Sequence, residues 1–166
     1  MRVKPTIRIF PDADQLARFA ARLFVSRFVL TLPIQVQFTV ALSGGSTPKK
    51  MFEISGNDER LKTQVRAGLW DYVHFFWSDE RHVPPDHAES NYKLAFDSML
   101  SPLGIRAANI HRIKGELEDA GEAASQYEAE ILLSRSGLTQ MKSNRRLSVF
   151  ASPMFGSHLR RKDLTL

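Results

Sequence analysis

Cysteine is absent from this 166-residue sequence. No disulfide, thiolate zinc site or cysteine nucleophile is available, and the absence is what we expect of a cytoplasmic protein. Long apolar runs are also absent, because the stretch at 19–34 is interrupted by Arg22 and Arg27 and stopped by Pro33. Such a stretch is too short and too charged to cross a bilayer. No apolar segment of the kind found in signal peptides follows residues 1–5, so we expect neither a signal peptide nor a membrane partner.

The composition is that of an ordinary globular domain, with 43% hydrophobic and 25% charged residues. These values exclude a disordered chain, a collagen and a coiled coil, and the length predicts one domain. The net charge of +5 is unevenly placed, because residues 134–166 hold seven Lys and Arg against one Asp. The remaining 16 basic and 17 acidic residues leave residues 1–133 nearly neutral, which argues against a nucleic-acid partner.

Apolar runs and helical periods alternate along the chain. Four runs predict strands, at 6–10, 38–42, 72–77 and 110–113. Four helices are expected between and after them, at 12–29, 48–54, 88–100 and 118–133. The second and third runs are continuously apolar, as in strands that are covered on both faces. Strands that alternate with helices predict an α/β fold with a mostly parallel sheet.

Two of the predicted helices carry a clear apolar face. Pro11 and Asp12 supply a stop and an N-cap for the first of them. Its apolar stripe recurs at helical spacing, at Leu16, Phe19, Ala20, Leu23 and Phe24. The helix at 88–100 presents a second such face, with Tyr92, Ala95, Phe96 and Met99. We expect both faces to be buried.

The periodic pattern is lost after residue 133. We therefore divide the chain into an α/β domain at 1–133 and a basic, divergent tail at 134–166. The charge run in that tail predicts a solvated and partly disordered segment. Within it, only residues 147–150 have the character of a strand.

The first candidate site is the turn at 43–48, between a predicted strand and a predicted helix. Gly44 and Gly45 let the backbone turn sharply and approach a ligand without a Cβ in the way. Thr47 is a good N-cap, and Pro48 suits the first helical position. The free N–H groups of a helix start favour a phosphate, although a plain strand-to-helix turn is the alternative. The turn matches neither the Walker loop nor the dinucleotide fingerprint.

The second candidate site is the charged loop at 78–84, which follows the third predicted strand. Ligands of open α/β sheets bind beyond the carboxyl ends of the strands, so both loops should meet at one edge. Arg81 can clamp a carboxylate or a phosphate, and Asp79 can accept hydrogen bonds from sugar hydroxyls. The alternative is a cluster of surface ion pairs.

Two other readings of this loop are disfavoured. His82 and His87 are poorly spaced for a metal pair on a segment that contains proline, so no metal is expected. Asp79 and Glu80 are neighbours on an extended segment and are expected to face opposite ways. A pair of carboxylates that acts as general acid and base is therefore not predicted.

Four motifs in order carry a resemblance to a known family. They are L-S-G-G-S-T-P at 42–48, W-D-Y-V-H-F-F-W-S-D-E-R-H-V-P-P-D at 70–86, E-S-N-Y at 89–92 and N-I-H-R-I-K-G at 109–115. In sequence, order and spacing they resemble the 6-phosphogluconolactonase family over about residues 6–133. Several motifs that agree in order are far more specific than any one of them alone.

The resemblance implies a Rossmann-like three-layer fold, no cofactor, and hydrolysis of 6-phosphogluconolactone to 6-phosphogluconate in the pentose phosphate pathway. Asp79 and Arg81 fall on the family's motif at the lactone, where Arg81 is suited to the charge that develops on the carbonyl oxygen. The family's Ser-Asn element corresponds to Ser90 and Asn91. Its phosphate loop corresponds to Ser43, Gly44, Gly45, Ser46 and Thr47.

Two alternatives remain beside the lactonase. Glucosamine-6-phosphate deaminases belong to the same superfamily and have a similar phosphate loop, so an amino-sugar phosphate isomerase or deaminase is the first. A non-catalytic protein that only binds phosphosugars is the second. The sequence leaves the oligomeric state open.

One family segment has no counterpart in this chain. Family members continue, after the helix that corresponds to 118–133, into a strand and a Gly-x-Gly-x-Asp-Gly-His-Thr segment whose His acts as general base. The nearest string here is at 156–158, and His158 is a poor substitute. Such a loss of pattern is expected of a shifted reading frame, a truncated gene product or genuine divergence, and it predicts a C-terminally incomplete fold with slow hydrolysis. His74 and His111 lie in predicted strands and are expected to be structural.

Overall fold

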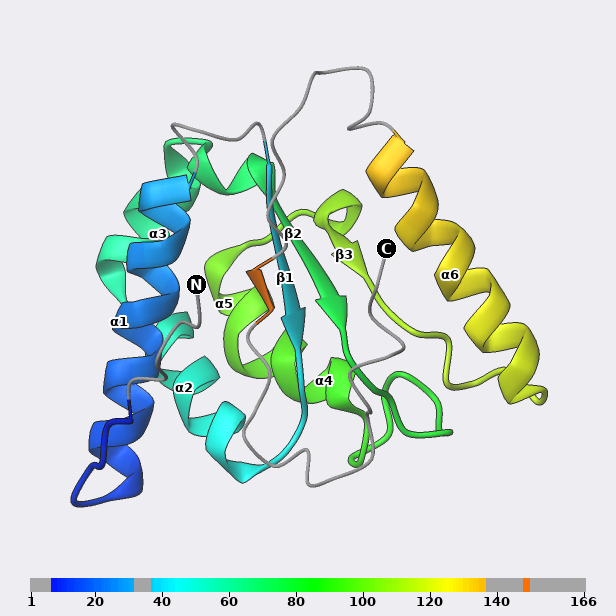
Figure 1. The fold of residues 1–166 in the computed structure, drawn as a ribbon, viewed down its shortest axis with the longest axis horizontal. Helices are drawn as coiled ribbons and strands as arrows, with labels where there is room; N and C mark the ends of the chain where they lie inside the picture. Colours follow the sequence, from blue (N-terminus) through cyan, green and yellow to red (C-terminus); the bar gives the residue numbers. More distant parts are fainter. Residues whose placement is uncertain (1–6, 32–36, 137–147, 150–166) are drawn as a thin grey trace, which may run out of the picture.

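In the part of the chain that the structure describes, four parallel strands form one sheet in the order β3-β2-β1-β4 (Figure 1). The computed structural model describes residues 7–31, 37–136 and 148–149. The strands are β1 (Phe38–Leu42), β2 (Val73–Trp77), β3 (Ile110–His111) and β4 (Ser148–Val149). The α-helices are α1 (Ala13–Thr31), α2 (Ser46–Gly56), α3 (Glu59–Arg66), α4 (Asn91–Ala95), α5 (Ser101–Leu103) and α6 (Ala120–Ser136). Further helical segments among the described residues are the 3-10 turns η1 (Leu69–Tyr72) and η3 (Ala107–Asn109) and the π segment η2 (Phe96–Leu100).

The predicted α/β class with a parallel sheet is confirmed. Strand β1 has the predicted bounds, and β2 begins one residue late because Tyr72 closes the η1 turn. Strand β3 ends at His111 instead of continuing to residue 113. The β1–β2 register runs from Phe38 opposite Val73 to Leu42 opposite Trp77, so both strands end at the same level.

One face of the sheet carries the main hydrophobic core. Phe38, Val40 and Leu42 are buried in alternation along β1, as the two-residue period of a strand requires. Phe24 and Phe28 of α1 pack against Phe38, with ring centroids 6.2 and 6.1 Å away. Burial of each such side chain stabilises the fold by about 1.5–3 kcal/mol. The same cluster includes Phe52, Trp70, Val73, Phe75 and Met99.

The buried stripe of α1 differs from the prediction. Asp12 caps the helix as expected, since its Oδ1 accepts the N–H of Gln15 at 2.7 Å. Of the predicted stripe, only Phe24 is fully buried, and the half-buried members are Leu16, Phe19, Ala20 and Leu23. The fully buried positions are Ala17, Ala21, Phe24 and Phe28. Helix α1 packs mainly against α2.

Residues 7–10 do not form the strand predicted at 6–10; residue 6 itself lies outside the described residues. Ile7 and Ile9 are 83% and 92% exposed. Strand β1 already pairs with β2 on one side and with β4 on the other. An alternating sequence is stabilised as a strand only by a neighbouring strand, and this segment pairs with none in the described sheet. Phe10 instead packs on Phe19, with ring centroids 5.0 Å apart.

Helix α3 is not predicted by the sequence, because the segment is strongly polar and only Leu61 is buried. Asp58 caps it by accepting the N–H of Arg60 at 2.8 Å. The helices predicted at 48–54 and 118–133 are present as α2 and α6. The helix predicted at 88–100 is α4 followed by the π segment η2, with Ala95 and Met99 fully buried on the predicted face. No helix among the described residues is long and apolar enough to cross a membrane.

The strand predicted at 147–150 is confirmed over Ser148–Val149. These two residues form β4, in which Ser148 pairs with Val40 and Val149 with Ala41. The rest of the chain after residue 136, His158 included, lies outside the described residues. The boundary between 1–133 and 134–166 stays a prediction.

Two histidines on the second face of the sheet bind each other. His74 Nδ1 lies 2.8 Å from His111 Nε2, and His111 Nδ1 lies 2.8 Å from Glu130 Oε1 of α6. The carboxylate accepts, so a neutral His111 carries its proton on Nδ1 and accepts from His74 through Nε2. The amide of Gln37 then donates to His74 Nε2 at 3.1 Å. Both rings are structural, as predicted, and they connect the sheet to α6.

Burial, and then the charge of neighbouring His111, lower the pKa of His74 below its ordinary value of 6.5. The unfolded chain therefore binds a proton at His74 more readily than the folded chain does. We expect the free energy of unfolding to be constant above the unfolded pKa and to decrease as the pH falls below about 6.5. One linked proton limits this slope to about 1.4 kcal/mol per pH unit.

Urea unfolding between about pH 7.5 and about pH 5 checks this expectation, because carboxylates with lowered pKa values respond only at more acid pH. In a His74→Gln variant the decrease should be smaller. An equal slope in the two proteins would assign the dependence to another group.

Candidate active site

The turn after β1 is built around Gly45. Its φ of 109° lies in the region that only glycine adopts readily, and α2 begins directly after it at Ser46. The prediction of Thr47 as N-cap and Pro48 at the first helical position is wrong, because Gly45 takes the N-cap and moves both residues into the first turn. No side chain caps this helix start. Its first N–H groups are therefore left for another acceptor.

Gly44 is in contact with Asn91, the first residue of α4. A Cβ placed on Gly44 would overlap Asn91 Oδ1, far inside the separation that non-bonded atoms tolerate. Asn91 is only 5% exposed. The absence of a side chain at Gly44 is thus what allows Asn91 to lie against the first loop.

The second loop is joined to the first at the ends of the two strands. Ser78 donates its N–H to Leu42 O at 2.9 Å. Its Oγ lies 3.0 Å from the same carbonyl and 2.7 Å from Ser43 Oγ. The two loops therefore meet at one edge of the sheet, as expected from parallel strands.

Asp79 and Glu80 both face the start of α4. Asn91 Nδ2 donates to Asp79 Oδ2 at 3.0 Å and to Asp79 O at 3.1 Å. Glu80 Oε1 accepts the N–H of Asn91 at 2.7 Å. The expectation that the two carboxylates face opposite ways is wrong, because both residues lie beyond the end of β2, where the alternation of a strand no longer holds.

Glu80 is the site residue that the sequence analysis misses. Its carboxylate accepts from the backbone and from a side chain at the α4 start, including Tyr92 N–H at 2.9 Å and Ser90 Oγ at 3.2 Å. In the sequence, only the start of α4 is signalled, by the N-cap Ser90, whose Oγ accepts Lys93 N–H at 3.1 Å. Glu80, the second acceptor for this helix start, comes from the second loop, and no local pattern connects it to Ser90.

Arg81 is one of the residues that line a cavity of about 490 Å³ between the second loop and α6. Its side chain is exposed. A Cβ on Gly115 would overlap the carbonyl oxygen of Arg81, so the glycine is what allows the chain after β3 to pass close to the second loop. Tyr127 of α6 also lines the cavity, and its hydroxyl bonds both Trp77 N and Trp77 O at 2.8 Å. Burial raises the pKa of this phenol far above its ordinary value, so it stays protonated and can donate.

The histidines of the second loop are engaged by backbone groups. His82 Nε2 donates to Leu117 O at 2.6 Å. His87 Nδ1 accepts the N–H of Glu89 at 3.2 Å. Among the described residues, no group of three or more histidines and carboxylates could hold a metal ion.

Comparisons with known proteins agree with this geometry. A sequence model of the family described as glucosamine-6-phosphate isomerases/6-phosphogluconolactonase matches residues 11–149, which contain both loops. The chain belongs to this family. A 6-phosphogluconolactonase of Nostoc sp. is 34% identical over 129 residues, or 78% of this chain and 50% of that protein. One of Treponema pallidum is 40% identical over 124 residues, or 74% of this chain and 47% of that protein.

Solved structures of the family share the fold. A 6-phosphogluconolactonase of Trypanosoma cruzi has a TM-score of 0.67 at 28% identity, covering 81% of this chain and 52% of that one. The chain thus spans about half the length of the curated relatives that it matches. The resemblance inferred from the four motifs is confirmed for family and fold.

The contact between Gly44 and Asn91 can be tested by adding one methyl group. In Gly44→Ala the Cβ must displace the Asn91 side chain, so we expect a loss of about 1–3 kcal/mol in the free energy of unfolding. The matched control is Gly121→Ala in α6, where the nearest atom is an Asp119 carboxylate oxygen at 3.1 Å on an exposed side chain. Urea unfolding of both variants should show destabilisation in the first only. Equal stability of the two would contradict the close approach of Asn91.

Proposed function

We propose that this protein acts on 6-phosphogluconolactone and hydrolyses it to 6-phosphogluconate. The observation that carries the proposal is the union of the 43–47 loop with the 79–81 loop through Asn91, at the carboxyl edge of the sheet. Ligands of open α/β sheets bind at this edge. Relatives that match 78% and 74% of this chain are named 6-phosphogluconolactonases.

The phosphate of the substrate is assigned to the start of α2. Gly45 turns the backbone there, and no side chain occupies the first N–H groups of the helix. These groups and the helix dipole favour an anion. Ser46 and Thr47 lie in the first turn, where their hydroxyls can add hydrogen bonds to the phosphate. Gly44 and Ser43 complete this loop next to Ser78.

The lactone ring is assigned to the second loop. In the reaction, a water oxygen attacks the C1 carbonyl, the bond from C1 to the ring oxygen breaks, and the ring oxygen takes a proton to become a hydroxyl. Arg81 is suited to the negative charge that develops on the carbonyl oxygen, because its guanidinium is exposed beside the cavity. Asp79, held by Asn91, can accept a hydrogen bond from a sugar hydroxyl, and Ser90 keeps Asn91 at the start of α4.

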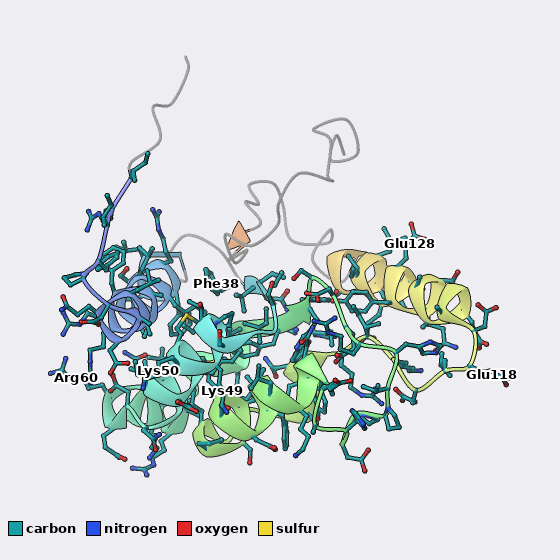
Figure 2. All side chains as sticks on the ribbon, turned by 90° about the horizontal axis from the view of Figure 1, so that it is seen from below. Phe38, Lys49, Lys50, Arg60, Glu118 and Glu128 are labelled. Carbon is teal, nitrogen blue, oxygen red and sulfur yellow. The ribbon has the colours of Figure 1, made fainter. Side chains whose placement is uncertain are left out.

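Binding of 6-phosphogluconate tests the assignment of Arg81. We expect Arg81→Ala to raise the dissociation constant, by an amount equivalent to about 1.5–3 kcal/mol for a lost charge-assisted hydrogen bond. The control is Arg60→Ala, because Arg60 projects from α3 on the side of the molecule away from α6 (Figure 2). Isothermal titration calorimetry measures both variants. An unchanged affinity in Arg81→Ala removes this residue from the site. Stronger binding of glucosamine 6-phosphate than of 6-phosphogluconate by the unaltered protein would favour the deaminase reaction instead.

Turnover by this 166-residue chain is expected to be slow. A general base contributes about 10²–10⁴ to the rate, and the family's histidine segment has no counterpart in the sequence. His82 and His87 are already bonded to Leu117 O and Glu89 N–H. We expect lactone hydrolysis below about 1 s⁻¹ once the spontaneous reaction is subtracted. A faster rate would identify His82, His87 or His158 as the base to replace first.

A further inference from the structure

The carboxylate of Glu80 is occupied by the protein itself. Oε1 accepts the backbone N–H of Arg81 and of Asn91, each at 2.7 Å. Oε2 accepts Tyr92 N–H at 2.9 Å and the Ser90 hydroxyl at 3.2 Å. An ionised carboxylate offers about four acceptor positions, so four donors leave none for a ligand.

These bonds fix where α4 begins. The first N–H groups of a helix have no partner within the helix. Glu80 supplies the acceptor for Asn91 and Tyr92, and Ser90 supplies it for Lys93. The backbone of Asn91 is thus held at the second loop by a residue of that loop.

The side chain of Asn91 then contacts both loops. Its Nδ2 donates to the carboxylate and to the carbonyl of Asp79, and its Oδ1 lies against Gly44. A displacement of the α4 start would move this amide away from both contacts at once. The position of the second loop relative to the phosphate loop depends on it.

We propose that Glu80 is a positioning residue. It holds Asn91, and through Asn91 it sets the carboxylate of Asp79 and the contact with Gly44, without touching the ligand. The geometric part of this inference stands on the contacts alone, whereas its effect on affinity rests on the proposed function.

The free protein tests the geometric part. In Glu80→Gln the amide nitrogen cannot accept, so at least one N–H of the α4 start loses its partner. We expect the NMR signals of the Asn91 side-chain amide and of the Gly44 backbone amide to shift. The matched control is Glu59→Gln, at the start of α3, where the carboxylate bonds Lys62. Unshifted signals in a folded Glu80→Gln protein would overturn the proposal.

A milder variant covers the case in which Glu80→Gln does not fold. Glu80→Asp keeps the charge but shortens the side chain by one methylene group, which withdraws the carboxylate from the N–H groups of Asn91 and Tyr92. The same two signals should shift in this variant. Their constancy would overturn the proposal.

Measurements of affinity for 6-phosphogluconate distinguish two roles of Glu80: positioning Asn91 for the ligand, or only stabilising the start of α4. We expect Glu80→Gln to weaken binding about tenfold, which corresponds to 1.4 kcal/mol and to one hydrogen bond to a charged group. In an Asn91→Ala background the same change should alter affinity less than about twofold, while it still lowers the free energy of unfolding in both backgrounds. Equal weakening in the two backgrounds would overturn action through Asn91. If the unaltered protein does not bind 6-phosphogluconate, the proposed function fails and the NMR signals still decide the role of Glu80.

Discussion

The side-chain amide of Asn91 connects the two loops that follow β1 and β2. Parallel pairing of these strands places Leu42 and Trp77 at one level, and Ser78 extends the contact through its N–H to Leu42 O and its Oγ beside Ser43 Oγ. Asn91 adds a constraint further along the second loop, since it donates twice to Asp79 and lies against Gly44. The proposed function depends on this contact, because the two loops are proposed to bind two parts of one molecule and must therefore keep a fixed separation.

The two neighbouring acids illustrate how one fold uses like groups differently. Glu80 has the longer side chain and reaches the backbone of the α4 start, where its charge is matched by N–H groups and the helix dipole. Asp79 is shorter and accepts no backbone N–H of that helix start; its carboxylate accepts the Asn91 side-chain amide and the Ser78 hydroxyl. One carboxylate therefore stabilises structure, and the other stays beside the exposed Arg81.

Helix α6 is held to the sheet largely by directional polar contacts. Strand β3 ends at His111, opposite Phe76, so Trp77 at the end of β2 has no partner on that side of the strand. The Tyr127 hydroxyl takes that place by bonding both the N–H and the carbonyl of Trp77. Glu130 holds the histidine pair in the same way. Such hydrogen bonds fix the orientation of α6 on the sheet. Those of the histidine pair depend on the protonation state of the rings, whereas apolar packing does not depend on pH.

The sequence by itself determined the order of strands and helices, the parallel class and the position of the glycine loop, because hydrophobic period and glycine content act over neighbouring residues. It also determined the family, since four short motifs occur in order. It predicted a strand at 6–10 that residues 7–10 do not form, because alternation alone supplies no partner.

Only the tertiary structure decided which residues meet. Glu80 lies in the second loop and Asn91 in helix α4, Ser43 and Ser78 are 35 residues apart, and Tyr127 and Trp77 are 50 apart. No local period encodes such pairs. They form because hydrogen-bonding groups that folding removes from water must find acceptors and donors wherever the packed chain brings them.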